Sequence, residues 1–400
     1  MAKRIKELDM NKNILLGVSG GIAAYKAIEL ASLLSKAGFS VKTVLTDNAQ
    51  NFVAGINFAA ITHGSVHSSL FGDADPIPHI TLADWADLIV VAPATANIVA
   101  KAARGLADDL LSTTLLAHTK PVLYVPAMNV NMYENPATQA NLQTLRERGQ
   151  HILEPVTGLL ACGYEGKGKY PPNSEVLCAI RCFLEYPEDL SGTSVMVSAG
   201  ATAEPIDPMR MITNRSSGRM GLAIARAFAL RGAKVTLVHG LMDEKPPYYL
   251  HQAIFAPTVQ LMHDAVLKSA KGCQIIVKCA AVSDFKPLKA ASRKIKKGGN
   301  LNLELVPTPD ILAQLGKLKT KKQMLVGFAA ETDNLVANAR EKLQRKNLDL
   351  ICVNHLDTAG ADQTTLSVIS AKDAKNARPP VLSGDKFEVA LRLVERIIKP

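Results

Sequence analysis

Short apolar runs alternate with helix-period segments in two separate series along this 400-residue chain. The first series predicts strands at Ile14–Val18, Val41–Leu45, Leu88–Ala92 and Val122–Val125, with helices at Ile22–Ala37, Asp108–Ala117 and Thr138–Arg148. The second predicts strands at Val195–Ala199, Lys234–Val238, Ile275–Ala280, Leu325–Ala329 and Leu350–Val353, with helices at Met220–Arg231, Val259–Ala270 and Leu335–Lys346. Such alternation is typical of doubly wound α/β domains, in which helices cover both faces of a mostly parallel sheet.

The stretch Tyr186–Gly192 separates the two series. It predicts two domains, residues 1–190 and 191–400, each of ordinary size for one hydrophobic core. With 48% hydrophobic and 20% charged residues, the chain has the composition of a globular protein and not of a disordered or fibrous one.

The sequence carries no sign of a membrane or secreted protein. No apolar run approaches the roughly 18 residues that cross a bilayer, and the charged segment Met1–Met10 has no apolar core of a secretion signal. Six cysteines without a C-x-x-C pair are too sparse for a disulfide framework or a zinc site. We therefore expect a cytoplasmic protein with reduced thiols.

Charge is shared unevenly between the two halves. Residues 1–190 carry 15 Lys and Arg against 18 Asp and Glu, whereas residues 191–400 carry 31 against 18. The basic second half indicates an anionic partner, either a nucleic acid or a nucleotide polyphosphate. Its densest basic stretch, Lys286–Lys297, has only Phe285 beside it as a stacking aromatic, which disfavours a groove for single-stranded nucleic acid. A merely solvated lysine loop is the alternative.

Small and polar residues follow four predicted strands of the first half. The glycine turn Gly17–Gly21 leads into a helix whose N-terminus suits a phosphate, to which Ser19 can add a hydroxyl. Its spacing does not match the dinucleotide motif G-x-G-x-x-G. Thr46, Pro93–Asn97 and Pro126–Asn129 follow the other strands. Because ligands bind at strand carboxyl ends in such sheets, we expect a flat mononucleotide cofactor; a tight turn without a ligand is the alternative for the glycines.

Two titratable residues of the first half are candidates for chemistry. His79 precedes the run Ile80–Asp87, and a lone histidine is most often structural or solvated. Cys162 lies in the glycine-rich loop Ala161–Lys169, which has the composition of a mobile flap over an active site. A buried inert thiol is the usual alternative for a cysteine, but a loop this rich in glycine and charge favours exposure.

Together these motifs resemble those of the flavin-containing cysteine decarboxylases. Among them, they are most similar to the bacterial bifunctional phosphopantothenoylcysteine decarboxylases and phosphopantothenate–cysteine ligases of coenzyme A biosynthesis. The resemblance implies a flavodoxin-like or Rossmann-like first domain that binds FMN, followed by a second Rossmann-like α/β domain that binds a nucleotide. The residues it assigns to FMN are Gly17, Ser19, Gly20, Gly21, Ile22, Thr46, Pro93, Ala94, Thr95, Asn97 and Met128.

The resemblance also implies a reaction for the first domain. FMN oxidises the substrate thiol to a thioaldehyde, which supplies the electron sink that decarboxylation requires, and the reduced flavin then returns the electrons. His79 matches the family's catalytic histidine, Asn129 the amide that holds the substrate carboxylate, and Cys162 the proton donor. One position departs from the family pattern: Lys169-Tyr170 replaces Arg-Met in the flap, which removes the bidentate geometry of an arginine.

The second half also places small polar residues after a buried strand, at Ser198–Asp207, and before a predicted helix, at Ile212–Gly221. Ser216 and Ser217 at that helix start suit an anion. No G-x-x-x-x-G-K-[ST] motif occurs, which excludes a P-loop mechanism. Lys342 and Lys346 share a helix face, and such a pair of lysines is most often simply solvated. Together with the basic stretch Lys286–Lys297, they nevertheless indicate a site for an anion.

Here the sequence is similar to the ligase half of the same family, which implies that CTP, carried with Mg²⁺, activates phosphopantothenate as an acyl cytidylate that the amine of cysteine attacks. The motifs are Asn214–Gly218, Ala280–Asp284, Lys294–Lys297, Pro309–Ile311 and Gly327–Thr332. Asn214 matches a residue that handles the acyl cytidylate, and Lys294 counts as both catalytic and nucleotide-binding. The residues assigned to CTP are Asp284, Lys294, Pro309, Asp310, Ile311, Leu312, Phe328, Lys342 and Lys346. The metal ligands stay unassigned.

Two other functions compete with this interpretation. A Rossmann-type NAD(P) oxidoreductase requires the G-x-G-x-x-G loop that both strand-to-helix turns lack. A basic nucleic-acid-binding protein would explain the charge, but no helix-turn-helix or RNA-binding signature accompanies it. The resemblance further implies a homo-oligomer, with decarboxylase trimers packed into a dodecamer, ligase dimers, and active sites completed by neighbouring subunits.

Overall fold

The computed structural model describes residues 12–71, 75–186, 188–298, 300–331, 335–355, 363–372 and 379–399. The segment Met1–Met10 and the motif residue Thr332 lie outside them. The chain divides into two compact units, Met1–Glu185 and Tyr186–Pro400. The α/β class is confirmed in both units, because each is built on a sheet whose central strands are parallel. In the described part of the chain, no helix combines the length and apolar character needed to span a membrane.

The sheet of the first unit has six parallel strands in the order β3-β2-β1-β4-β5-β6. Their bounds are Asn13–Val18 (β1), Ser40–Leu45 (β2), Val66–His67 (β3), Leu88–Ala94 (β4), Val122–Pro126 (β5) and His151–Ile152 (β6). Strand β4 is buried along its whole length, as expected for a strand covered on both faces. The four strands predicted in this half are therefore confirmed, and their ends are neighbours.

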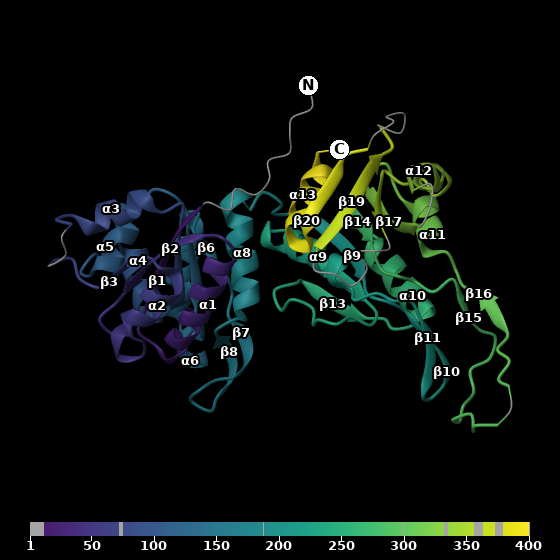
Figure 1. Ribbon diagram of the computed structural model, residues 1–400, viewed down its shortest axis with the longest axis horizontal. Coiled ribbons are helices and arrows are strands. Elements are labelled where there is room, and N and C mark those ends of the chain that lie inside the picture. The colour runs from purple at the N-terminus through teal and green to yellow at the C-terminus, as the bar shows by residue number, and fades with distance from the viewer. Residues whose placement is uncertain are drawn as a thin grey trace. The chain divides into compact units, whose positions relative to one another are not determined.

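Helices cover both faces of this sheet (Figure 1). On one face α1 (Tyr25–Lys36) packs against α2 (Gly55–Thr62) and α8 (Asn173–Glu185). The other face carries α3 (Pro78–Trp85), α4 (Ala96–Arg104), α5 (Leu110–Ala117) and α7 (Pro136–Glu147), with the short α6 (Val130–Glu134) against α7. Helix α5 starts two residues later than predicted because Asp109 caps it, accepting a bond from the N–H of Ser112 at 2.8 Å.

Outside the sheet, the first unit carries a two-stranded hairpin that the apolar pattern does not predict. Strands β7 (Val156–Leu159) and β8 (Glu165–Lys169) pair antiparallel, and the glycine-rich loop with Cys162 forms the turn between them. A hairpin of glycine and charged residues has little apolar periodicity, so only its structure reveals it.

The sheet of the second unit has eight strands in the order β13-β12-β9-β14-β17-β18-β19-β20. The strands from β13 to β18 are parallel to their neighbours, while β19 and β20 extend the sheet antiparallel. Their bounds are Ser194–Ala199 (β9), Lys234–His239 (β12), Gln252–Phe255 (β13), Ile275–Lys278 (β14), Met324–Glu331 (β17), Leu350–His355 (β18), Gln363–Ser370 (β19) and Val381–Asp385 (β20). Strand β14 ends two residues earlier than predicted, because the N–H of Ala280 bonds the hydroxyl of Ser198.

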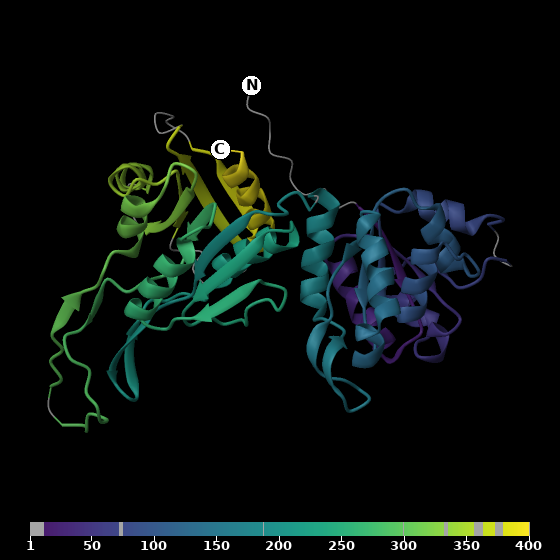
Figure 2. The ribbon, with the colours of Figure 1, turned by 180° about the vertical axis from the view of Figure 1, so that it is seen from behind.

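Helices α9 (Arg219–Leu230) and α13 (Lys386–Ile398) pack together on one face of this sheet, whereas α10 (Val259–Ala270), α11 (Ile311–Leu318) and α12 (Leu335–Arg345) cover the other. Two hairpins project from the sheet side by side (Figures 1 and 2). One joins β10 (Ala203–Asp207) to β11 (Arg210–Thr213), and the other joins β15 (Phe285–Pro287) to β16 (Leu305–Pro307).

The second unit begins earlier than the predicted boundary because of one buried arginine. Arg231 has no exposed side-chain surface and donates two bonds to the carboxylate of Asp189, at 2.8 and 2.6 Å. It also pairs with Glu395 of α13 at 3.0 Å and lies over the ring of Tyr186, 4.9 Å from its centroid. These contacts tie Tyr186 and Asp189 to the second unit.

Candidate functional site

The carboxyl ends of β1 and β4 mark the point at which the strand order of the first sheet reverses. In open α/β sheets this is where ligands bind. A cavity of about 1090 Å³ opens there, lined by residues from four strand ends, the start of α1 and the β7–β8 hairpin. The predicted site residues that line it are Ser19, Gly20, Gly21, Ile22, Thr46, Thr95, Asn97, Met128, Asn129 and Cys162.

Ser19 joins the two central strand ends. Its buried hydroxyl donates to the carbonyl oxygen of Pro93 at 2.7 Å and accepts from the N–H of Thr95 at 2.9 Å. The single hydroxyl proton is therefore used within the protein, so this hydroxyl holds the floor of the cavity together and does not point a donor at a phosphate.

Three residues assigned to the flavin are absent from the cavity lining: Gly17, Pro93 and Ala94. Gly17 lies inside β1, where a Cβ would come within 2.6 Å of the Leu111 side chain, so its small size serves helix packing. Gly20 is needed for a similar reason, since a Cβ there would be 2.3 Å from the Cβ of Asn48. Contacts with neighbouring protein atoms therefore require glycine at two of the three glycine positions of this turn.

Asn129 and Cys162 meet at the cavity wall. The side-chain amide of Asn129 donates to Sγ of Cys162 at 3.0 Å, while its Oδ1 accepts from the N–H of Asn131 and caps α6. The thiol is exposed, as expected. Hydrogen bonds from the N–H of Tyr164 and from Asn129 lower its pKa. The two residues predicted to act on one substrate are therefore brought together.

Strand β8 is fixed against the loop that carries Asn129, although the glycine content of this segment indicates mobility. The N–H of Met128 bonds the carbonyl of Gly168 at 3.0 Å. Lys167 pairs with Glu154 at 2.7 Å, and the same carboxylate accepts from the hydroxyl of Tyr133 in α6 at 2.5 Å. Burial would raise the pKa of Glu154, but the bonds from Lys167 and Tyr133 outweigh it and lower that pKa.

His79 does not reach this cavity. It lies at the start of α3, half-buried, and is absent from the cavity lining. Its Nδ1 is buried and makes no hydrogen bond within the described residues. Within one subunit, the structure does not bring His79 to Asn129 and Cys162.

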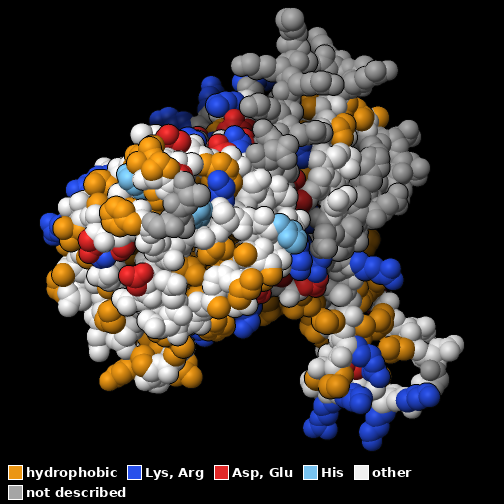
Figure 3. Space-filling view, turned by 60° about the vertical axis from the view of Figure 1, so that its left-hand side comes forward, with side chains coloured by type: hydrophobic (Ala, Val, Ile, Leu, Met, Phe, Trp, Pro, Cys, Tyr) orange, Lys and Arg blue, Asp and Glu red, His pale blue; other side chains and the backbone are white. Residues whose placement is uncertain are grey.

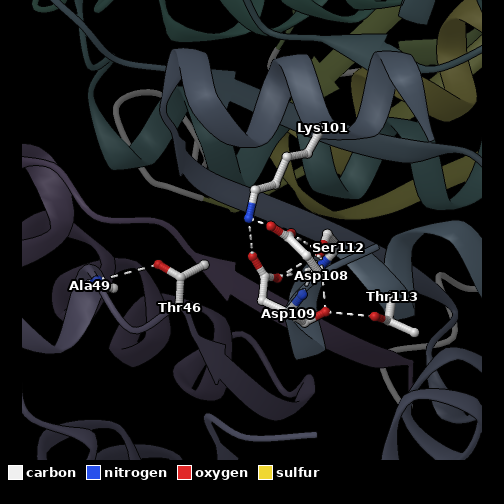
Figure 4. A network of polar contacts seen from close by, with 7 residues as sticks. All are labelled: Thr46, Ala49, Lys101, Asp108, Asp109, Ser112 and Thr113. Carbon is white, nitrogen blue, oxygen red and sulfur yellow. Dashed lines mark hydrogen bonds and ion pairs between the residues drawn. The ribbon is translucent and has the colours of Figure 1, made fainter. Parts of the chain in front are cut away.

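The cavity also contains charged residues that the sequence analysis did not single out. Lys101 of α4 binds both Asp108 and Asp109, each at 2.6 Å (Figure 4). On another part of the wall, Lys26 has its pKa lowered by burial and by the nearby charge of Lys169. In both cases the interacting residues are separated in the sequence, so no short sequence motif predicts their contacts.

The second unit repeats the same arrangement of strand ends. The order of its strands reverses between β9 and β14. Here the N–H of Ala280 donates to the hydroxyl of Ser198 at 3.2 Å, and the N–H of Ala281 donates to the carbonyl of Gly200 at 2.8 Å. Next to this junction the amide of Asn214 donates to the carbonyl of Val282 at 3.1 Å. Asn214 and the motif that ends in Asp284 are therefore neighbours, as their predicted roles require.

A cluster of lysines lies beyond the end of β14. Lys346 pairs with Asp310, the N-cap of α11, at 2.7 Å. Lys278, the last residue of β14, donates to the carbonyl of Ala280 at 2.6 Å. Burial and the charges of Lys342 and Lys346 lower the pKa of Lys278 to about 8, while Cys279 and Asp310 act in the opposite direction. The sequence analysis missed Lys278, although a lysine that closes a buried apolar strand is itself a signal.

The other predicted nucleotide residues have mixed positions. Phe328 is half-buried on β17, and Lys294 is exposed in the loop between β15 and β16. Ile311 and Leu312 are buried in the core between the sheet and its helices, so their side chains serve packing and only their backbone can meet a ligand.

Comparison with known proteins decides the family. Residues 3–185 match the family Flavoprotein, and residues 190–399 match the family DNA/pantothenate metabolism flavoprotein C-terminal domain. The coenzyme A biosynthesis bifunctional protein CoaBC of Bacillus subtilis (strain 168) is 44% identical over 395 residues, which cover 97% of each chain. The chain belongs to the family of coenzyme A biosynthesis bifunctional proteins.

A second member of the coenzyme A biosynthesis bifunctional proteins, from Haemophilus influenzae, is 43% identical over 396 residues, again 97% of each chain. Among solved structures, the C-terminal domain of a coenzyme A biosynthesis bifunctional protein CoaBC is 34% identical, covers 52% of this chain and 96% of its own, and superposes with a TM-score of 0.44. Membership of this family removes the basis for the NAD(P) oxidoreductase and nucleic-acid-binding alternatives.

Proposed function

We propose that this chain catalyses two consecutive steps of coenzyme A biosynthesis. The second unit joins L-cysteine to 4′-phosphopantothenate with CTP, and the first unit decarboxylates the resulting phosphopantothenoylcysteine to 4′-phosphopantetheine. The observation that carries this proposal is the alignment with bifunctional relatives over 97% of both chains, which includes the strand-end sites of both units.

The cavity of the first unit fits a flavin mononucleotide. Gly21 lines it, and a Cβ there would lie only 3.3 Å from the methyl group of Thr95, so the absence of a side chain keeps this part of the wall clear. Helix α1 begins at the same wall, and the N–H groups at a helix start favour a phosphate. FMN would be held by this helix start and by the polar side chains of Thr46, Thr95 and Asn97.

When bound, the flavin supplies the oxidation and reduction that allow the substrate to lose carbon dioxide. The chain's own residues position the substrate and move protons. The amide of Asn129 carries two N–H bonds; the contact with Cys162 uses one, and the other suits the substrate carboxylate. Cys162 would hold a proton at an exposed Sγ, and its lowered pKa makes the thiol a better donor of that proton to the carbon that has lost carbon dioxide.

The second unit binds CTP at its lysine cluster. Lys346 pairs with Asp310, and Lys278 lies within the influence of the charges of Lys342 and Lys346, so an anion with several negative charges would offset their mutual repulsion. We assign Lys294 of the β15–β16 loop as a further cation, and such cations stabilise the charge on departing pyrophosphate. We assign Asn214, whose amide donates to the carbonyl of Val282, to the handling of the acyl cytidylate.

The proposal also includes a metal ion and further copies of the chain. Mg²⁺ would arrive with the phosphates of CTP. We also propose a homo-oligomer, with trimers of the first unit that pack into a dodecamer and dimers of the second. The distance of His79 from the cavity of its own subunit supports a site completed by a neighbour.

The first test is an absorbance spectrum of the purified protein, with the released cofactor identified by mass spectrometry. Stoichiometric FMN supports the assignment of the first unit, and a colourless protein that takes up no added FMN overturns it. For the second unit, CTP and 4′-phosphopantothenate together should release about one pyrophosphate per site, and further turnovers should require cysteine. Equal release from ATP, or none from CTP, would contradict the assignment.

A further inference from the structure

The lysine-rich loop between β15 and β16 is not free in solvent. In Figure 3, Lys and Arg side chains gather on the arm that this loop forms. Two backbone contacts fasten it to the neighbouring β10–β11 hairpin: the N–H of Ala291 bonds the carbonyl of Ile206 at 2.9 Å, and the N–H of Ile295 bonds Oδ2 of Asp207 at 3.1 Å. Arg293 and Lys294 lie between these two fixed points.

Asp207 makes the second contact from a position that water does not reach. Its side chain has no exposed surface, and its carboxylate accepts from the N–H groups of Met209 and Arg210 at 2.7 and 2.9 Å as well as from Ile295. Burial alone would raise its pKa, but the three backbone N–H groups and the charge of Arg210 outweigh it and lower the pKa. The carboxylate is therefore ionised and rigidly held at neutral pH.

Arg210 completes the contact from the other side. Its guanidinium binds Oδ2 of Asp207 at 2.7 Å and donates to the carbonyl of Ile295 at 3.2 Å. The N–H and the carbonyl of Ile295 are thus both bound by one ion pair. The N–H of Ile295 belongs to the same peptide unit as the carbonyl of Lys294, so this contact fixes the backbone on which the Lys294 side chain stands.

We propose that Asp207 is a positioning residue that orders Lys294 for the nucleotide. This inference rests on the proposed CTP-dependent reaction of the second unit. Arg293, Lys294, Lys296 and Lys297 repel one another, and a loop of such composition would otherwise be extended and mobile. Because Asp207 is neutralised by Arg210, it restrains the backbone without neutralising the lysines. The entropy of ordering the loop is then lost on folding and not on CTP binding.

Asp207→Asn tests the proposal, because an amide keeps the shape but loses the charge and one pair of acceptor sites. In the absence of CTP, trypsin should cut within residues 293–297 about tenfold faster in the variant than in the wild type. This factor corresponds to the free energy of about one hydrogen bond to a charged group. The KM for CTP should rise by a similar factor, with the flavin content unchanged. Asp264→Asn removes an exposed carboxylate on α10 and serves as the matched control.

Two results would overturn the inference while the proposed function stands: wild-type rates of tryptic cleavage in the variant, or an unchanged KM for CTP. A wild-type protein that consumes no CTP would instead overturn the proposed function. Hydrogen exchange of the unmodified protein covers the case in which Asp207→Asn does not fold. The amide of Ile295 should exchange at least tenfold more slowly than an unprotected amide, and exchange at the unprotected rate would also refute the contact.

Discussion

Nδ2 of Asn129 lies 3.0 Å from Sγ of Cys162 and donates a hydrogen bond to it. The two residues belong to separate loops, one after β5 and one at the tip of the β7–β8 hairpin. Because a donor at the sulfur stabilises the thiolate, this bond, together with the N–H of Tyr164, lowers the pKa of Cys162. The residue that we propose to orient the substrate carboxylate therefore also influences how readily the thiol releases its proton.

We predict that Asn129→Asp raises the pKa of Cys162, because the variant replaces an N–H donor with a negative charge. At pH 7 the rate at which iodoacetamide alkylates Cys162 should fall about tenfold, which corresponds to one pKa unit. Mass spectrometry of the Cys162 peptide over a pH series measures this rate. Asn131→Asp, in the next turn, is the control, and equal profiles for the two variants would show that the Asn129 amide does not act on the thiol.

We predict that His79→Asn and Cys162→Ser each lower decarboxylation about 100-fold or more, the usual range for loss of an acid or base. Flavin should stay bound in both. If a neighbouring subunit supplies His79, co-expression of the two inactive variants should restore activity, because mixed oligomers contain sites with both residues intact. Decarboxylation of 4′-phosphopantothenoylcysteine by the co-purified, differently tagged variants measures this. No recovery would mean that His79 acts within its own subunit or not at all.

We predict that Lys167→Met lowers the kcat of decarboxylation about three- to tenfold. The ion pair of Lys167 with Glu154 fixes β8 beside Asn129, but both side chains are partly exposed, so solvent screens part of its contribution. Lys167→Arg should restore the rate, since it keeps the charge. Glu165→Gln, exposed on the same hairpin, should behave as the wild type. The idea fails if Lys167→Met and Glu165→Gln have the same kcat.

The pH dependence of CTP binding tests Lys278. Its pKa of about 8 means that the ammonium is largely charged at pH 7 and largely neutral at pH 9. Lys278 should therefore contribute to CTP affinity at pH 7 and lose this contribution as the pH rises, although a bound polyanion shifts the transition upward. We predict that Lys278→Met raises the KM for CTP about tenfold at pH 7 and less at pH 9. A constant ratio of KM values across this range would exclude Lys278 from the nucleotide site.

Local periodicity predicted part of both sheets and of their helices, although the amphipathic helices α4 and α13 were not predicted. Every predicted strand and helix has a counterpart, and the strand ends at Ser19, Thr46, Thr95 and Met128 line one cavity. This succeeded because buried parallel strands are continuous apolar runs, and the doubly wound arrangement places their ends together.

What depends on contacts between distant segments could not be predicted. The strands of the β10–β11 and β15–β16 hairpins are too short to show an apolar period, and the two hairpins are joined by bonds such as that from Ile295 to Asp207. Gly17 fits the phosphate-loop pattern, but the Leu111 side chain explains its small size. His79 matches a family position, yet its place away from the cavity is a matter of tertiary structure.

The buried pairing of Arg231 with Asp189 has a practical consequence for anyone who wishes to express the two halves separately. A gene fragment that starts at residue 191, where the apolar pattern breaks, would omit Asp189 and Tyr186 and leave the arginine with Glu395. Such a fragment should be poorly soluble or unfolded. A fragment that starts at Tyr186 keeps all three partners and is the better choice for crystallisation and for assays of the ligase alone.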